Sequence, residues 1–230
     1  MEKKFTIRYI IILITFIICC CSCDRISSCS RADFNSPEVE NLYNACNLKE
    51  KIDYDIFAYA IIGIKNIKSH INRDIITVID YRKASTEERF FVIGLKNKKI
   101  LYSSLVAHGR GTGNNYAKTF SNKTGSKSSS LGFFITEESY KGKHGYSLKV
   151  RGIEKNINDN ARKRAIVVHG AQYVSNEFIN SYGRLGRSWG CPALPVDKSD
   201  EIINTIKNGS CIFILGKDSS YIRKSSFLHI

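Results

Sequence analysis

The chain has 230 residues, of which 43% are apolar and only three are proline, so it can bury one sizeable core and is not a largely disordered protein. Its formal net charge of +14 suits an anionic partner such as acidic lipid or an anionic wall polymer. The sequence has neither helix-turn-helix nor zinc-finger spacing, and no basic stretch interleaved with aromatic residues, so we expect no nucleic-acid partner. A solvated, lysine-rich surface is the alternative explanation of the charge.

Residues 1–23 have the pattern of an export signal. Lys3, Lys4 and Arg8 precede an apolar run at residues 10–18, as in a signal peptide. This run is shorter than the roughly 20 apolar residues that a stable membrane span needs. Cysteines follow at positions 19, 20, 21 and 23, and the segment resembles a degenerate lipoprotein signal with lipidation at Cys23. An uncleaved anchor and ordinary secretion are the alternatives, and all three export the domain, which we expect in the cell envelope as a membrane-tethered lipoprotein.

Two helices are expected before the main body of the protein. Residues 24–52 comprise a polar tether and then a first helix at residues 37–46. A second helix is expected at residues 53–67, because both segments carry apolar side chains at helical spacing.

Short strands follow from residue 74 onward, because the sequence becomes rich in β-branched and aromatic runs. The expected strands span residues 75–80, 90–95, 100–106, 131–136, 146–151, 165–169 and 211–215. Asp197 is the expected N-cap of a late helix that Gly209 closes. We therefore expect one mainly β domain with peripheral helices at residues 53–217, followed by a C-terminal tail at residues 218–230.

Cys191 is the cysteine whose surroundings suit chemistry. Cys29 and Cys46 precede the domain, and export leaves a disulfide between them open. Cys211 lies in an apolar run and is expected to be a buried strand residue. Cys191 instead follows Gly190, whose missing side chain lets backbone amides approach a ligand.

His169 is the candidate base for this thiol. It ends an apolar strand and is followed by a glycine, so a rigid element holds it beside an open loop. A free thiol has a pKa near 8.5 and needs a nearby imidazole to become nucleophilic at neutral pH. The amides of Gly190 and Cys191 are candidate donors to an oxyanion. A structural cysteine near an unrelated histidine is the alternative that the residues alone leave open.

The segments around these residues resemble the L,D-transpeptidase catalytic domain. His169-Gly170 followed by Ser188-Trp189-Gly190-Cys191 is similar to that family's active-site signature. Residues 54–216 resemble its murein L,D-transpeptidase catalytic domain-like branch, including the segments at residues 107–111, 120–122, 128–132 and 142–145. The resemblance implies a β-sandwich-like domain preceded by short helices, and a transferase that acts on peptidoglycan without metal or organic cofactor.

The resemblance also implies roles for individual residues. Cys191 would be the nucleophile, His169 its base, the amides of Gly190 and Cys191 the oxyanion donors, and Ser188 a residue that shapes the site. The thiolate would attack the third residue of a tetrapeptide stem and release the terminal D-alanine. An amine of another stem would then capture the thioester and give a 3-3 cross-link. Capture by water would make the protein a carboxypeptidase, and a non-catalytic wall-binding lipoprotein is a third alternative.

Several further residues are candidates for substrate contact. Arg187 and Tyr173 flank the two motifs and are candidates for binding a stem carboxylate. His108 and His144 are candidates for loop hydrogen bonding or substrate contact, because their spacing fits no familiar zinc site.

The chain departs from the family pattern beside the nucleophile. Trp189 replaces a residue that is commonly polar in the family, and Pro192-Ala193 replaces an apolar residue followed by arginine or asparagine. We expect both departures to affect the acceptor side of the pocket.

Overall fold

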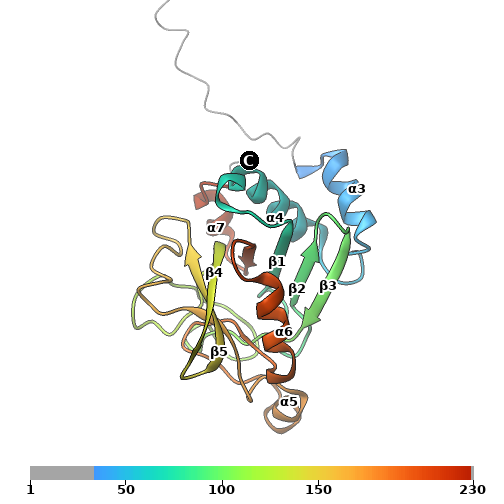
Figure 1. Cartoon of the computed structure of the whole chain (residues 1–230). Coiled ribbons are helices and arrows are strands. Elements are labelled where there is room, and N and C mark those ends of the chain that lie inside the picture. Colours follow the sequence, from blue (N-terminus) through green and yellow to red (C-terminus); the bar gives the residue numbers. More distant parts are fainter. Residues whose placement is uncertain (1–33, 229–230) are drawn as a thin grey trace, which may run out of the picture.

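A computed structural model describes residues 34–228 (Figure 1). The predicted export signal at residues 1–23, its lipidation candidate Cys23, and Cys29 lie outside the described residues. Within residues 34–228, none of the helices has the length and apolar character that a membrane span requires.

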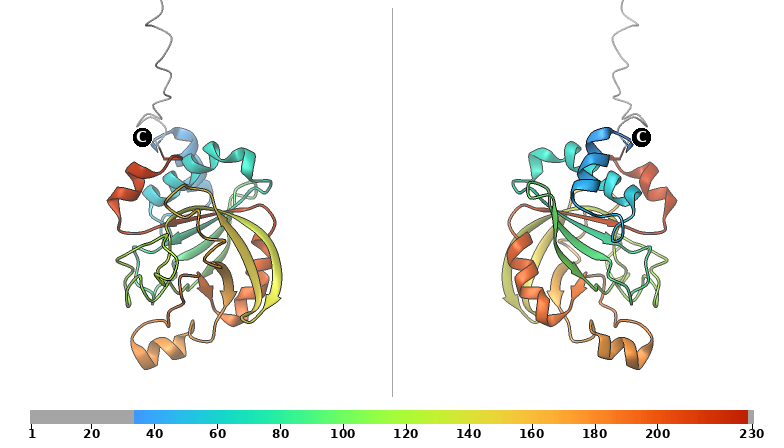
Figure 2. Two further views of the ribbon diagram at one scale, coloured as in Figure 1. Left: turned by 90° about the vertical axis from the view of Figure 1, so that its left-hand side faces the viewer. Right: turned by 90° about the vertical axis from the view of Figure 1, so that its right-hand side faces the viewer.

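The described strands form one continuous sheet of eight strands in the order β3-β2-β1-β8-β4-β5-β6-β7. The pairs β1–β8 and β6–β7 are parallel, and the other neighbouring pairs are antiparallel. The strands are β1 (Ile75–Asp80), β2 (Phe90–Gly94), β3 (Lys99–Ser104), β4 (Gly132–Gly142), β5 (Gly145–Gly152), β6 (Val167–Gly170), β7 (Ala193–Leu194) and β8 (Cys211–Leu215). The mainly β class is confirmed, with the strands in a single, strongly curved sheet (Figure 2).

Helices lie at the periphery of this sheet, as expected from the sequence (Figure 1). Ser36 caps the first of them, because its side chain accepts a hydrogen bond from the Val39 amide and Pro37 suits the first helical position. The helices are α3 (Pro37–Ala45), α4 (Tyr54–Asn66), the 3-10 turn η1 (Lys68–His70), α5 (Asn176–Tyr182), α6 (Val196–Ile206) and α7 (Ser219–Lys224).

Helices α4 and α6 pack on opposite faces of β4. The ring of Phe133 packs directly against Gly63 of α4. A Cβ on Gly63 would lie only 1.9 Å from a carbon of this ring. Three residues later, Thr136 Oγ1 donates a 2.7 Å hydrogen bond to the carbonyl oxygen of Ile206 at the end of α6. Alternate residues of a strand face opposite sides of a sheet. The first part of β4, residues 132–136, is therefore buried on both faces, which explains its apolar start.

Two differences from the sequence prediction concern the helices α6 and α7. Asp197 is not the N-cap of α6: Pro195 occupies that position, and Asp197 lies in the first turn, where a carboxylate favours the helix dipole. The predicted tail contains α7, which packs onto the domain. Tyr221 of α7 is only 3% exposed and donates a 3.1 Å hydrogen bond to the buried carboxylate of Glu154. A long-range polar contact thus fixes a segment whose own sequence has little apolar pattern.

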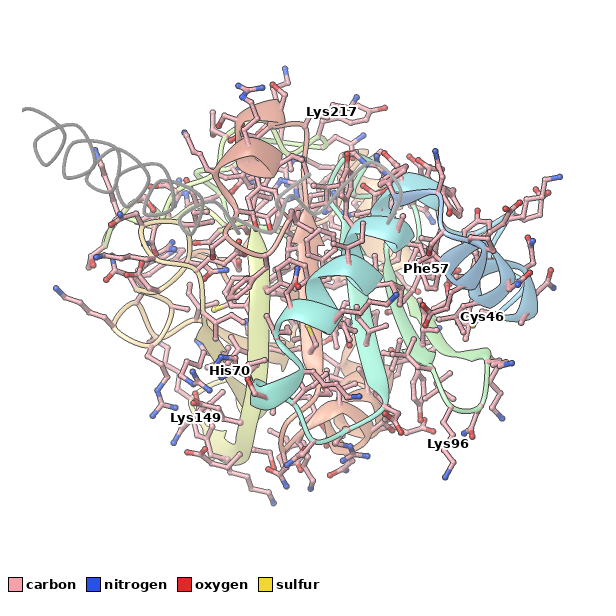
Figure 3. All side chains as sticks on the ribbon, turned by 90° about the horizontal axis from the view of Figure 1, so that it is seen from above. Cys46, Phe57, His70, Lys96, Lys149 and Lys217 are labelled. Atoms are coloured by element: carbon pink, nitrogen blue, oxygen red, sulfur yellow. The ribbon has the colours of Figure 1, made fainter. Side chains whose placement is uncertain are left out.

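The positive charge of the surface is widely spread. Seen from above, Lys96, Lys149 and Lys217 lie far apart around the outline of the molecule (Figure 3). In the same view Phe57 of α4 and Cys46 lie toward the side where α3 covers the domain, and both side chains are buried.

Candidate active site

Strands β6 and β7 hold the two predicted reactive residues at neighbouring positions. His169 of β6 pairs with Ala193 of β7 in parallel register. Cys191 lies two residues before Ala193 in the chain. His169 and Cys191 both line one cleft of about 620 Å³. The structure therefore brings together two residues that are 22 positions apart in the sequence.

The surroundings of His169 favour a neutral imidazole with a free Nε2. Its Nδ1 lies 2.9 Å from the carbonyl oxygen of Gly170. A carbonyl only accepts, so Nδ1 carries the proton in this pair and the lone pair is on Nε2. The ring of His144 stacks on His169 with centroids 4.7 Å apart and an interplanar angle of 29°. Burial lowers the pKa of His169, and the neighbouring His144 lowers it further, so the imidazole is ready to accept a proton at neutral pH.

The thiol of Cys191 is in its neutral form in this environment. Burial raises its pKa, while a hydrogen bond from the Val167 amide and the positive charge of Arg164 lower it. Its thiol donates a long hydrogen bond of 3.9 Å to the carbonyl oxygen of Ala165. No hydrogen bond joins this thiol to His169 among the described residues. The resting pair is thus a neutral thiol and a neutral imidazole that share a cleft.

Ser188 braces the loop that carries the nucleophile. Its buried hydroxyl donates a 2.6 Å hydrogen bond to the carbonyl oxygen of Cys191 and accepts a 3.0 Å hydrogen bond from the amide of Gly190. The second bond gives the Gly190 amide a partner inside the loop in this structure. The predicted oxyanion role of the Gly190 and Cys191 amides stays a prediction.

The segments that carried the family resemblance converge on this loop. Gly109 forms an isolated bridge with Ser188, and its amide donates a 3.0 Å hydrogen bond to Ser129 Oγ. Ser129 Oγ in turn donates to the carbonyl oxygen of Gly190 at 3.2 Å. A Cβ on Gly109 would lie 2.8 Å from Gly190 Cα, so the two backbones approach as closely as glycine allows.

Gly190 itself fits only as glycine. Its φ of +125° is a conformation that L side chains rarely adopt. A Cβ there would lie 2.8 Å from the carbonyl oxygen of Ser128.

Arg187 and Tyr173 line the cleft, as their predicted contact with substrate requires. Arg187 Nη1 donates to the carbonyl oxygen of Gly113 at 3.2 Å and to Asn114 Oδ1 at 2.6 Å. Tyr173 is held at neutral pH as a phenol, because burial and Cys191 raise its pKa to about 12. Their binding of a carboxylate stays a prediction.

His108, by contrast, does not contact the cleft. Its side chain is 1% exposed, and its Nδ1 accepts a 2.8 Å hydrogen bond from Arg89 Nη2. Its Nε2 donates to the carbonyl oxygen of Gly113 at 3.3 Å. Burial and Arg89 lower the pKa of His108 to about 4. The predicted substrate contact of His108 is therefore wrong: this neutral side chain supports the loop that holds Arg187.

The sequence did not single out two of the charged residues of the cleft, Lys143 and Arg164. Arg164 belongs to a run of basic residues at positions 162–164, and local sequence does not distinguish the one that turns inward. For His144 the sequence left two roles open, loop hydrogen bonding and substrate contact. Its position at the tip of the β4–β5 hairpin stacks its ring on His169. Within residues 34–228, no three His, Cys, Asp or Glu side chains cluster as metal ligands would.

Only one of the two departures from the family pattern faces the cleft. Trp189 lines it, is 69% exposed, and has Lys127 Nζ at 4.9 Å from its ring centroid. Ala193 is fully buried in its pairing with His169, and Pro192 lines a small internal void instead. Pro192 and Ala193 thus do not line the cleft, and their effect on the acceptor side stays a prediction.

A thiol and a neutral imidazole at one cleft are the arrangement on which cysteine-dependent acyl-transfer enzymes are built. Residues 48–215 match the family model described as L,D-transpeptidase catalytic domain, and the chain belongs to this family. The match covers the sheet from β1 to β8 and the helix α4 that precedes it.

Solved structures of this kind resemble the chain distantly. An L,D-transpeptidase from Mycobacterium smegmatis is 15% identical over 62% of this chain and 59% of its own, with a TM-score of 0.39. The helical cell shape determining protein Pgp2 from Campylobacter jejuni is 15% identical over 70% of this chain and 55% of its own, with a TM-score of 0.40. The chain thus spans less than two thirds of the length of these proteins. Comparison with curated proteins gave no match.

Proposed function

We propose that the protein is an exported cysteine acyltransferase that forms a thioester between Cys191 and a peptidoglycan stem peptide. The observation that carries this proposal is the shared cleft of Cys191 and His169 in a chain of the L,D-transpeptidase family. The catalytic unit would be residues 53–217, with α7 packed against it.

The proposed reaction has two acyl-transfer steps. His169 Nε2 takes the thiol proton while the Cys191 sulfur bonds to the carbonyl carbon of the third stem residue. The amide bond to the terminal D-alanine then breaks, and its nitrogen leaves with the proton from His169. An amine of a second stem attacks the thioester, the C–S bond breaks, and the sulfur regains a proton. The Cys191 amide would stabilise the oxyanion of both steps, and one such donor contributes about 2.7–4 kcal/mol in other enzymes.

The charge of the cleft supports an anionic substrate. Lys143, Arg164 and Arg187 line it, and no Asp or Glu side chain does so among the residues described. Peptidoglycan stems carry free carboxylates, so a cleft of this sign favours their entry. Arg187 and Tyr173 are the proposed contacts for such a carboxylate.

The same proposal places the protein in the cell envelope. Residues 1–23 would direct export, and a lipid on Cys23 would tether the domain to a membrane. The dispersed lysine surface is compatible with additional binding to anionic wall polymers, which high salt would weaken.

The test is mass spectrometry of the full-length protein in detergent, incubated with a disaccharide-tetrapeptide beside Cys191→Ala. The proposal expects an adduct of stem mass minus alanine on the wild type, a cross-linked dimer in solution, and neither product with the variant. Tripeptide without dimer would identify water as the acceptor. Equal inactivity of both proteins under reducing conditions with several stem types would overturn catalysis and favour wall binding, which salt-dependent pelleting with purified wall would then measure.

A further inference from the structure

Arg164 carries a positive charge that no acidic side chain neutralises. Its Nη1 donates to the carbonyl oxygen of Ser121 at 2.8 Å and to Ser130 Oγ at 2.6 Å. Its Nη2 donates to Ser126 Oγ at 3.4 Å and to the carbonyl oxygen of Ser128. All four acceptors are neutral, and no carboxylate lies within ion-pair distance of Arg164 among residues 34–228. The guanidinium is therefore firmly held and its charge is uncompensated.

This charge lies beside the glycine that precedes the nucleophile. A Cβ on Gly190 would be 3.2 Å from Arg164 Nη2, and Gly190 immediately precedes Cys191. The residue after Arg164, Ala165, accepts the hydrogen bond of the Cys191 thiol. Arg164 and Cys191 also line the same cleft. The segment at residues 164–165 thus lies beside the nucleophile loop, and the hydrogen bond between Cys191 and Ala165 joins the two.

The surroundings of Cys191 give this charge a specific effect. A partly buried thiolate loses part of its hydration, and burial accordingly raises the pKa of Cys191. Arg164 is the charged group whose field lowers the pKa of this thiol. The other charged or titratable groups that line the cleft are Lys143, His144, His169, Tyr173 and Arg187.

We propose that Arg164 is a positioning residue that holds a fixed positive charge against Cys191 and stabilises the thiolate on which the proposed acyl transfer depends. Its planar fork suits this task, because the guanidinium stays charged while its hydrogen bonds fix its position. His169 would then remove the proton, and Arg164 would lower the free energy of the anion that remains. Loss of the charge would make every step that forms this anion less favourable.

The test measures the ionisation of Cys191 without any peptidoglycan. Full-length wild type, Arg164→Gln, Arg164→Lys and the control Arg162→Gln are treated with iodoacetamide across a range of pH. Trypsin then releases residues 188–198, in which Cys191 is the only cysteine, and mass spectrometry gives its rate of alkylation. Arg162 is a close control, because its Nη1 pairs with Glu137 on the surface and its side chain is 50% exposed.

The proposal expects the alkylation midpoint to move to higher pH in Arg164→Gln and to stay in place in Arg162→Gln. A rise of about one in the thiol pKa would slow alkylation near neutral pH about tenfold. Arg164→Lys keeps the charge and is expected to alkylate within about threefold of the wild type. An unchanged midpoint in folded Arg164→Gln would overturn the proposal and reduce Arg164 to a brace for the serine loop.

The lysine variant decides the matter if Arg164→Gln does not fold. A tenfold loss of alkylation in folded Arg164→Lys would then overturn the proposal, because its charge is retained. Failure of the transpeptidase assay with a normal Arg164 effect on alkylation would reject the proposed function alone.

Discussion

Replacing Ser188 by alanine should destabilise the domain and impair the site together. The change removes the hydroxyl that donates to the Cys191 carbonyl oxygen and accepts from the Gly190 amide. Ser188 is 6% exposed, so the loop loses two buried hydrogen bonds and the Gly190 amide is left without its partner. A net hydrogen bond contributes about 0.5–1.5 kcal/mol, and an unpaired buried donor costs about 1–3 kcal/mol.

We therefore expect Ser188→Ala to lower the free energy of unfolding by about 2–4 kcal/mol. For a chain of this size that loss corresponds to a fall in Tm of roughly 5–10 °C. The brace also sets the position of the nucleophile, and a displacement of about 1 Å can reduce turnover about 100-fold. Calorimetry measures the first effect, and the rate of thioester formation with a tetrapeptide stem measures the second.

Ser181→Ala is the matched control. Its hydroxyl donates to the carbonyl oxygen of Glu177 on the exposed side of α5, so the same chemical change should leave both Tm and rate close to wild type. Wild-type Tm and wild-type rate in Ser188→Ala would refute the reasoning, because they would mean that the loop keeps its conformation without the serine bridge.

Three further predictions concern pH and backbone. Burial raises the pKa of Glu154, so this carboxyl group binds a proton more tightly in the folded state than in the unfolded state. The protonated carboxyl group therefore contributes to stability at low pH, and this contribution is lost as the pH rises through the raised pKa. Denaturation curves should therefore show that Glu154→Gln, compared with wild type, loses less stability between about pH 4 and neutral pH, and parallel curves would contradict this. Because the pKa of His169 is lowered, we expect kcat/KM to fall on the acid side with a midpoint below the ordinary imidazole pKa of about 6.5. A pH–rate profile measures this midpoint, and a value above about 6.5 would contradict the prediction. Gly190→Ala adds a Cβ 2.8 Å from the Ser128 carbonyl oxygen at a φ of +125°. We therefore expect the free energy of unfolding, measured with denaturant, to fall by about 1–3 kcal/mol, and the acylation of Cys191 to be strongly reduced. A variant with normal stability would show that the loop can rearrange.

The sequence predicted seven of the eight described strands because their apolar runs are local signals, and it missed the two-residue strand β7. The strand at β1 has the predicted bounds, and β8 does as well. Helices α5 and α7 were missed, because each is short and few of their side chains are buried. Their positions depend on contacts with distant parts of the chain, such as the hydrogen bond between Tyr221 and Glu154.

The candidate site was predictable in its reactive pair and less so in its surroundings. Cys191 and His169 lie in distinctive motifs, and the structure places both at the cleft. His108 and His144 have similar glycine-flanked sequences, yet one is buried on Arg89 and the other stacks on His169. Local sequence does not encode which loop folds inward, because that choice depends on partners far along the chain.

The position of β8 has a consequence for the order in which the molecule can assemble. The strands β1–β3 form one half of the sheet and β4–β7 the other, and β8 is the strand that hydrogen-bonds to both. A chain still emerging from the ribosome lacks β8 until residue 215 has been made, so each half keeps an open edge until then. Such long-range pairing slows folding. The two halves of the sheet can therefore join only after nearly all of the described domain has been synthesised.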